Sequence, residues 1–144
     1  MGFTPNYKYI VQAAYNNRPN RIPLYEHIIC LEIMEEILGK DFAELEKGDT
    51  ADKREFFRIY AEFFRKMGYD TLSFERCVGA VMPGSGALGG HKPGVIKDRA
   101  DYNAYPWDSV AELFFDRFSQ DFQLLGEVMP PGMKAVGGPG NGVF

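Results

Sequence analysis

The sequence predicts an α/β fold, in which short strands are separated by amphipathic helices. The predicted order along the chain is helix, strand, helix, helix, strand, long loop, helix and strand. Two of these strands follow their helices closely, one after Gly68 and the other after the turn Pro130-Pro131-Gly132. Because strands that are separated by helices pair in parallel through crossover connections, we expect a parallel sheet.

The first helix and the first strand are predicted over residues 5–16 and 21–27. Thr4 is expected to cap the helix, with a proline in the first turn, where proline is tolerated. Residues 16–20 contain asparagines and a proline, which end the helix. Pro23 is compatible with a position near the start of a strand.

Two amphipathic helices are predicted next, over residues 28–38 and 52–67. In the first, apolar residues share one face, and Gly39 ends the helix. In the second, Asp49 or Thr50 is expected to cap the start. Its broad apolar face consists of Phe56, Ile59, Tyr60, Phe63, Phe64 and Met67.

The second half of the sequence predicts two further strands and one long helix. The strands are expected over residues 69–75 and 133–136, with an irregular loop over residues 77–106. A glycine loop follows the last strand, at the point where an α/β unit binds its ligand and begins its next helix. We therefore expect residues 1–144 to form one partial domain that is incomplete at its C-terminus. The helix is expected over about residues 107–127, and its core face over Val110, Leu113, Phe114, Phe118, Phe122 and Leu125.

The composition argues against several classes of protein. Hydrophobic residues make up 45% of the 144 residues and aromatic residues 15%, which is typical of a folded chain rather than a disordered one. A net charge of −4 gives no basic surface for nucleic acid. No apolar run approaches the roughly 20 residues of a membrane helix. Two cysteines do not form a disulfide framework, so we expect a cytoplasmic protein. From the charge and the apolar runs, we expect it to bind neither nucleic acid nor membranes.

Four segments carry a resemblance to a known family. They are Arg18-Pro-Asn-Arg-Ile-Pro-Leu24, Glu62-Phe-Phe-Arg-Lys-Met-Gly-Tyr-Asp-Thr-Leu72, the pair Gly94-Val-Ile-Lys-Asp98 with Tyr105-Pro-Trp107, and Met129-Pro-Pro-Gly-Met-Lys-Ala-Val-Gly137. In this order and spacing the chain resembles the uroporphyrinogen decarboxylase (URO-D) superfamily, which also contains the corrinoid/coenzyme M methyltransferases. The resemblance covers nearly the whole chain.

The resemblance implies a (β/α)8 TIM barrel, of which this chain would be the N-terminal portion, with about three strands and their helices. It also implies an enzyme of tetrapyrrole- or corrinoid-linked chemistry. Zinc and a corrinoid would be cofactors of the parent enzyme, and the resemblance places no zinc ligand in this segment. The implied partners are a small-molecule or tetrapyrrole-like ligand, and a second copy of the chain or a corrinoid protein.

Two departures from the family pattern favour methyl transfer. The resemblance places an arginine-rich, carboxylate-binding segment after the first strand, but residues 26–36 contain four glutamates and neither arginine nor lysine. It also places an aspartate at the end of the second strand, where this chain has Glu75. Decarboxylation of a uroporphyrinogen-type substrate stays open as an alternative. A non-catalytic half-barrel that binds or assembles with another chain is the second alternative.

The candidate site residues are those expected at the carboxyl ends of the strands, where barrels hold their chemistry. Glu26 and His27 follow the first strand, Glu75 and Arg76 follow the second, and Asn141 lies in the loop after the third. We expect Glu75 and His27 to be catalytic, and Glu26, Arg76 and Asn141 to bind substrate. Two structural alternatives stay open: His27 as a cap at a helix start, and Glu75 with Arg76 as an ion pair.

Three further features concern the glycine loop, the single tryptophan and metal binding. The segment Gly84-Ser-Gly-Ala-Leu-Gly89 has the glycine spacing of a dinucleotide-binding loop, but it lies too far beyond its strand. We therefore expect an active-site lid there. Trp107 is expected to pack on the first turn of the last helix or to shape a pocket. Four potential metal ligands lack paired spacing, so no metal site is predicted from His27, Cys30, Cys77 and His91.

Overall fold

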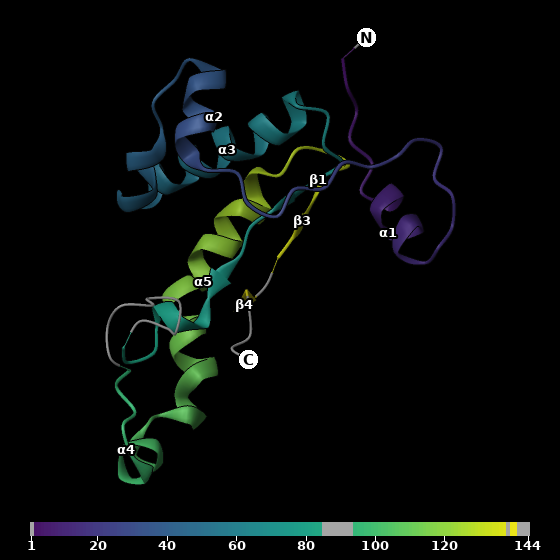
Figure 1. Ribbon diagram of the computed structural model, residues 1–144. Helices are drawn as coiled ribbons and strands as arrows, with labels where there is room; N and C mark the ends of the chain where they lie inside the picture. Colours follow the sequence, from purple (N-terminus) through teal and green to yellow (C-terminus); the bar gives the residue numbers. More distant parts are fainter. Residues whose placement is uncertain (1, 85–93, 138, 141–144) are drawn as a thin grey trace. The chain divides into compact units, whose positions relative to one another are not determined.

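The computed structural model describes residues 2–84, 94–137 and 139–140, which Figure 1 shows in their order along the chain. These residues form two compact units. Unit 1 contains Met1–Phe74 and Asp121–Val136, and unit 2 contains Glu75–Gln120 and Gly137–Phe144. The structure is mixed α/β, as the sequence predicts. The closed barrel stays a prediction.

Helix α3 (Thr50–Lys66) is the longest helix that lies wholly in unit 1. Its start is fixed by a capping box, in which an Asp49 carboxylate oxygen accepts from the backbone N–H groups of Ala51 and Asp52 at 2.8 and 3.0 Å. The Asp52 carboxylate accepts in return from the Asp49 backbone N–H at 3.2 Å. The predicted cap at Asp49 is confirmed.

The core of unit 1 is built on the aromatic face of α3. Aromatic ring pairs at edge-to-face or tilted angles connect this face to neighbouring segments of the chain. For example, Phe57 on α3 lies 5.1 Å from Phe74 between ring centroids. The predicted apolar face is confirmed except at Met67, which is 39% exposed. The buried core residues are Met34, Phe42, Phe56, Phe57, Ile59, Tyr60, Ala61, Phe63, Phe64, Leu72, Phe74, Leu124, Leu125 and Met133.

Strands β1 (Thr71–Ser73) and β3 (Lys134–Val136) form a parallel pair in unit 1, with Leu72 opposite Ala135. Figure 1 shows the two strands side by side. The predicted strands at residues 69–75 and 133–136 are therefore confirmed with shorter bounds, and their predicted parallel pairing is confirmed as well. All three residues of β1 are buried, as is typical of a strand in a parallel sheet.

Helix α2 (Leu31–Leu38) ends at Gly39, which adopts φ +62° in the left-handed region, as predicted. The chain then turns into a 3₁₀ helix, Ala43–Lys47. A carboxylate oxygen of Glu35 accepts from the backbone N–H groups of Phe42 and Ala43, both at 2.7 Å. These two bonds hold the turn and lower the pKa of Glu35 below its usual 4.5.

The N-terminal predictions need correction. The described residues 21–27 form no strand, and helix α1 (Lys8–Ala14) is shorter than predicted. Its N-cap is Tyr7, which makes no side-chain capping bond, so the predicted cap at Thr4 is wrong. None of the seven residues of α1 is buried.

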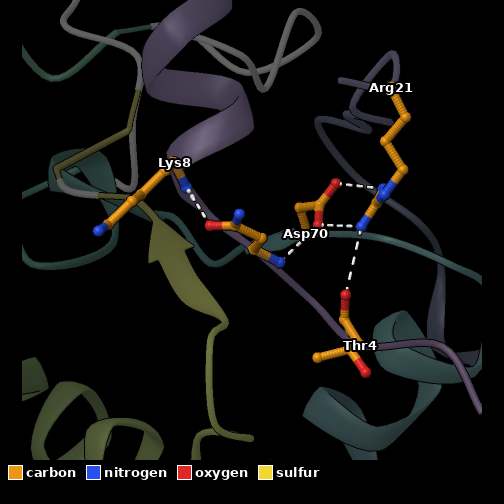
Figure 2. Close-up of polar contacts among 5 residues, drawn as sticks. Thr4, Lys8, Arg21 and Asp70 are labelled. Atoms are coloured by element: carbon orange, nitrogen blue, oxygen red, sulfur yellow. Dashed lines mark hydrogen bonds and ion pairs between the residues drawn. The ribbon is translucent and has the colours of Figure 1, made fainter. Parts of the chain in front are cut away.

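Arg21, the first residue of the predicted strand, forms an ion pair with the buried Asp70 carboxylate. Its guanidinium donates to both carboxylate oxygens of Asp70, one of them at 2.5 Å, and also contacts the Thr4 carbonyl (Figure 2). Asp70 is fully buried and accepts a third bond from the Asn6 backbone N–H at 2.6 Å. Because Asp70 directly precedes β1, this ion pair ties three segments together at the amino end of the strand.

Unit 2 contains the parallel pair β2 (Arg76–Cys77) and β4 (Pro139–Gly140) and the helix α4 (Arg99–Ala104). The predicted irregular loop over residues 77–106 was wrong in this respect, because α4 begins there with Asp98 as its cap. The unit also holds the 3₁₀ helix Trp107–Ser109 and the first half of α5 (Val110–Val128).

Helix α5 confirms the predicted last helix and corrects its buried face. Phe114 and Phe118 are buried as predicted, whereas Leu113 is 36% exposed. Further along, Leu124 and Asp121 are buried, although neither was predicted to be. The Asp121 carboxylate accepts from the Lys53 ammonium at 2.9 Å, which compensates the buried charge. Among the described residues, no helix is long and apolar enough to cross a membrane.

We expect the Arg21→Met variant to lose about 3 kcal/mol of unfolding free energy, because the buried Asp70 carboxylate keeps only its backbone donor. This is the lower end of the usual range, since the Arg21 side chain is 35% exposed. The double variant Arg21→Met/Asp70→Leu should lose less, because it removes the buried charge. Guanidinium unfolding followed by circular dichroism measures both. Glu44→Gln, which breaks an exposed pair with Lys47, is the control. An Arg21→Met variant as stable as the wild type would contradict the anchoring role.

We expect the Glu35→Gln variant to be less stable than the wild type near neutral pH and equally stable in acid. The folded pKa of Glu35 lies below its usual 4.5. Its contribution is therefore present above that value and is lost as the pH falls through the lower folded pKa. Unfolding free energies measured across this range should converge as the carboxylate protonates. A stability difference that persists at the acid end would disprove it, and Glu32→Gln on the same helix is the matched control.

Candidate functional site

The carboxyl end of β1 is organised by two hydrogen bonds to Ser73. The Tyr60 hydroxyl donates to the Ser73 carbonyl at 2.7 Å, and the Ser73 hydroxyl donates to the Glu26 carbonyl at 2.5 Å. Ser73 is itself 3% exposed. The chain around Glu26 is therefore held at the carboxyl end of β1, although it is not a strand.

Glu26 and His27 are placed by this contact in unit 1. Both side chains are exposed, and only the backbone carbonyl of Glu26 meets Ser73. The expectation that they follow a first strand is wrong, because the described residues 21–27 are irregular. Their catalytic and binding roles stay predictions.

Glu75 and Arg76 lie in unit 2, two and three residues beyond the last residue of β1. Both are half-buried, and Arg76 is the first residue of β2. The Arg76 guanidinium lies over the Phe118 ring at 5.7 Å from its centroid, which is a cation–π distance. Glu26 and His27 belong to unit 1, so the two pairs lie in different units. Asn141 lies outside the described residues.

An apolar cavity of about 280 Å³ lies in unit 2, directly after the carboxyl end of β2. Two of its walls, Val78 and Gly79, are the residues that follow the strand. Ligands of open α/β sheets bind outside the carboxyl ends of parallel strands, and β2 is parallel to its partner. The described lining residues are Val78, Gly79, Met82, Pro83, Gly84, Gly94, Val95, Ile96, Tyr105, Trp107 and Val110.

Two aromatic rings form one wall of this cavity. Tyr105 and Trp107 lie 4.5 Å apart between ring centroids, with a 46° angle between their planes. The Tyr105 hydroxyl donates to the Pro83 carbonyl at 3.0 Å, and the Trp107 indole N–H donates to the Tyr102 carbonyl at 2.9 Å. Both donors are therefore used within the chain, and the Trp107 ring also packs on the Tyr102 ring at 5.2 Å between centroids.

The cavity contrasts with a charged hollow on unit 1, of about 130 Å³, between the end of α2 and the helix α3. There the Glu55 carboxylate bonds both Arg58 and Lys40. The Arg58 guanidinium is the largest cause that lowers the pKa of Glu55 to about 2. These cations are already compensated, so the hollow has the character of a surface ion-pair cluster.

No group of three or more His, Cys, Asp or Glu side chains in the described part of the chain is arranged to hold a metal ion. Cys30 and Cys77 are both free and exposed. The glycine motif at residues 84–89 and His91 lie largely outside the described residues, as does most of the predicted lid.

Sequence reasoning missed the cavity as a whole. Its described lining is apolar. Of the lining residues, only Trp107 is predicted from the sequence as one that could shape a pocket. The signal that could have found it was local: Val95-Ile96 and Tyr105-Pro-Trp107 lie in the last part of the predicted loop and at the start of the last helix. Comparisons with protein-family models, with curated proteins and with solved structures found no match for the chain.

We expect Ser73→Ala to cost about 1 kcal/mol and to speed amide hydrogen exchange at residues 24–28, because the Glu26 carbonyl loses its donor. The matched control is Thr71→Val on the same strand. The Thr71 hydroxyl is buried and has no partner among the described residues, so its removal should be neutral or stabilising. Equal exchange rates in the Ser73 variant and the wild type would show that Ser73 does not hold this segment.

Proposed function

We propose that the chain acts as a uroporphyrinogen decarboxylase-like enzyme of tetrapyrrole- or corrinoid-linked chemistry, and that its reaction is methyl transfer. The observation that carries the proposal is the apolar cavity directly after parallel strand β2. Such a position is where α/β enzymes bind their substrates. The resemblance of four segments to the superfamily supplies the reaction class.

The cavity supports methyl transfer over decarboxylation of a polycarboxylate. A substrate with many carboxylates needs arginine or lysine forks. None of the described lining residues carries a charge. The absence of basic residues over 26–36 points in the same direction.

A corrin or porphyrin macrocycle exceeds this cavity. A cavity of about 150 Å³ accepts one benzene ring, so 280 Å³ accepts about two rings. The cavity therefore fits the apolar edge of a macrocycle, against Tyr105 and Trp107. A corrinoid bound there would supply the carrier of the methyl group. The described residues do not fit a zinc site, and we derive no step through zinc.

The chain's own residues would hold the remainder of the substrate. Arg76, fixed over Phe118, would orient an anionic group, and Glu75 would accept or donate a proton. Both are half-buried, which strengthens their electrostatic interactions relative to exposed side chains. The two free cysteines support the reducing, cytoplasmic setting that we propose for this reaction.

We expect the chain to bind aquocobalamin in equilibrium dialysis and to show quenched fluorescence of Trp107, its single tryptophan. Trp107→Ala should weaken binding about tenfold, because one ring face is lost. Tyr15→Ala, at an exposed position of unit 1, is the matched control. Binding of uroporphyrin without cobalamin would favour the decarboxylase alternative, and binding of neither would overturn the proposal.

A further inference from the structure

We infer that the cavity of unit 2 selects an uncharged, flat, apolar group of one or two rings. The inference rests on the proposed function in that it concerns the same cavity, and it names the chemical class of the group that enters. The proposed function places the edge of a macrocycle in this cavity. The present inference is broader: the cavity accepts any substrate whose inserted end carries neither a carboxylate nor an ammonium group.

First, the polar groups in the cavity wall decide which hydrogen bonds a ligand can form. A ligand can bond only to donors and acceptors that the protein leaves open. The Tyr105 hydroxyl proton and the Trp107 indole N–H are donated to the carbonyls of Pro83 and Tyr102. What these two side chains can present to a ligand is therefore ring surface and the Tyr105 hydroxyl oxygen as an acceptor.

The second step is charge. The described lining residues are apolar, aromatic, proline or glycine, so none of them can form an ion pair with an ionised group. A charged group that enters must lose hydration without gaining an ion-pair partner among the described lining residues, which is costly. An uncharged ring loses little hydration and gains contacts with Met82, Val95 and Ile96.

The third step is shape. The planes of Tyr105 and Trp107 meet at 46°, so a flat ring can stack on one while its edge faces the other. Gly84 closes the wall near Val95: it adopts φ +84°, and a Cβ built on it would lie 2.8 Å from a Val95 methyl carbon. Even one methyl group at residue 84 would displace Val95, so this side of the cavity has little spare room.

The test uses the full chain and three naphthalene probes of one shape: 2-naphthol, 2-naphthoate and 2-naphthylmethylammonium. Trp107 gives the single indole N–H signal in a nitrogen–proton correlation spectrum, because the chain has one tryptophan. We expect 2-naphthol to shift this signal and to bind at least tenfold tighter than either charged probe. Equal or tighter binding of a charged probe would overturn the inference.

Two lining variants and one control locate the binding. Val110→Phe, on the first turn of α5, should fill the cavity and weaken 2-naphthol at least tenfold. Val95→Asp should reverse the preference towards the ammonium probe, and Val95 is 48% exposed, so the substitution is compatible with folding. Val11→Phe on α1 should change nothing. Unchanged binding of 2-naphthol in both lining variants would overturn the inference even if one variant folds poorly.

The outcomes separate this inference from the proposed function. Selective binding of 2-naphthol without any binding of cobalamin or uroporphyrin would sustain the ring-binding cavity and remove the tetrapyrrole-linked function. In the opposite case, the Val110→Phe variant binds cobalamin as the wild type does, and 2-naphthol does not bind selectively. This result would support the proposed function and exclude a role for the cavity.

Discussion

The buried carboxylate of Asp70 is the constraint on which unit 1 depends. A fully buried charge must be compensated, and the chain supplies Arg21 and the Asn6 backbone N–H for this purpose. These partners come from two separate N-terminal segments, which the ion pair joins to the start of β1. The Arg21 guanidinium also lies 4.6 Å from the Phe3 ring centroid, so the pair carries an aromatic contact with it.

The segment predicted as the first strand is irregular, and it is held near its two ends. The Arg21 side chain forms the ion pair with Asp70 at the amino end of β1. From there the chain reaches the carboxyl end, where one hydroxyl–carbonyl bond from Ser73 to Glu26 holds it. Charge thus fixes one end of β1, and neutral hydrogen bonds fix the other. In α/β folds the amino ends of strands serve stability and the carboxyl ends serve ligands.

The parts of the fold that could be predicted are those fixed by local pattern. Helix α3 has a capping residue, a broad apolar face and a terminal glycine, and all three signals agree with the structure. The strand pair β1 and β3 could be predicted because each strand follows a helix through a short turn. The burial of Asp121 could not be predicted in this way, because its burial depends on Lys53, 68 positions away in the sequence. A carboxylate in a helix is expected to be exposed to solvent unless a partner for its charge is known.

The place of the candidate site was predictable, and its chemistry was not. The rule that carboxyl ends carry function selected Glu75 and Arg76, and the cavity begins only two residues further on, at Val78. Charged residues do not mark the cavity itself, because its described lining contains no acidic or basic side chain. In the cavity wall, Tyr105 and Trp107 each direct their polar donor to a backbone carbonyl. Hydrogen bonds that would be counted as structural therefore decide what kind of ligand the cavity can accept.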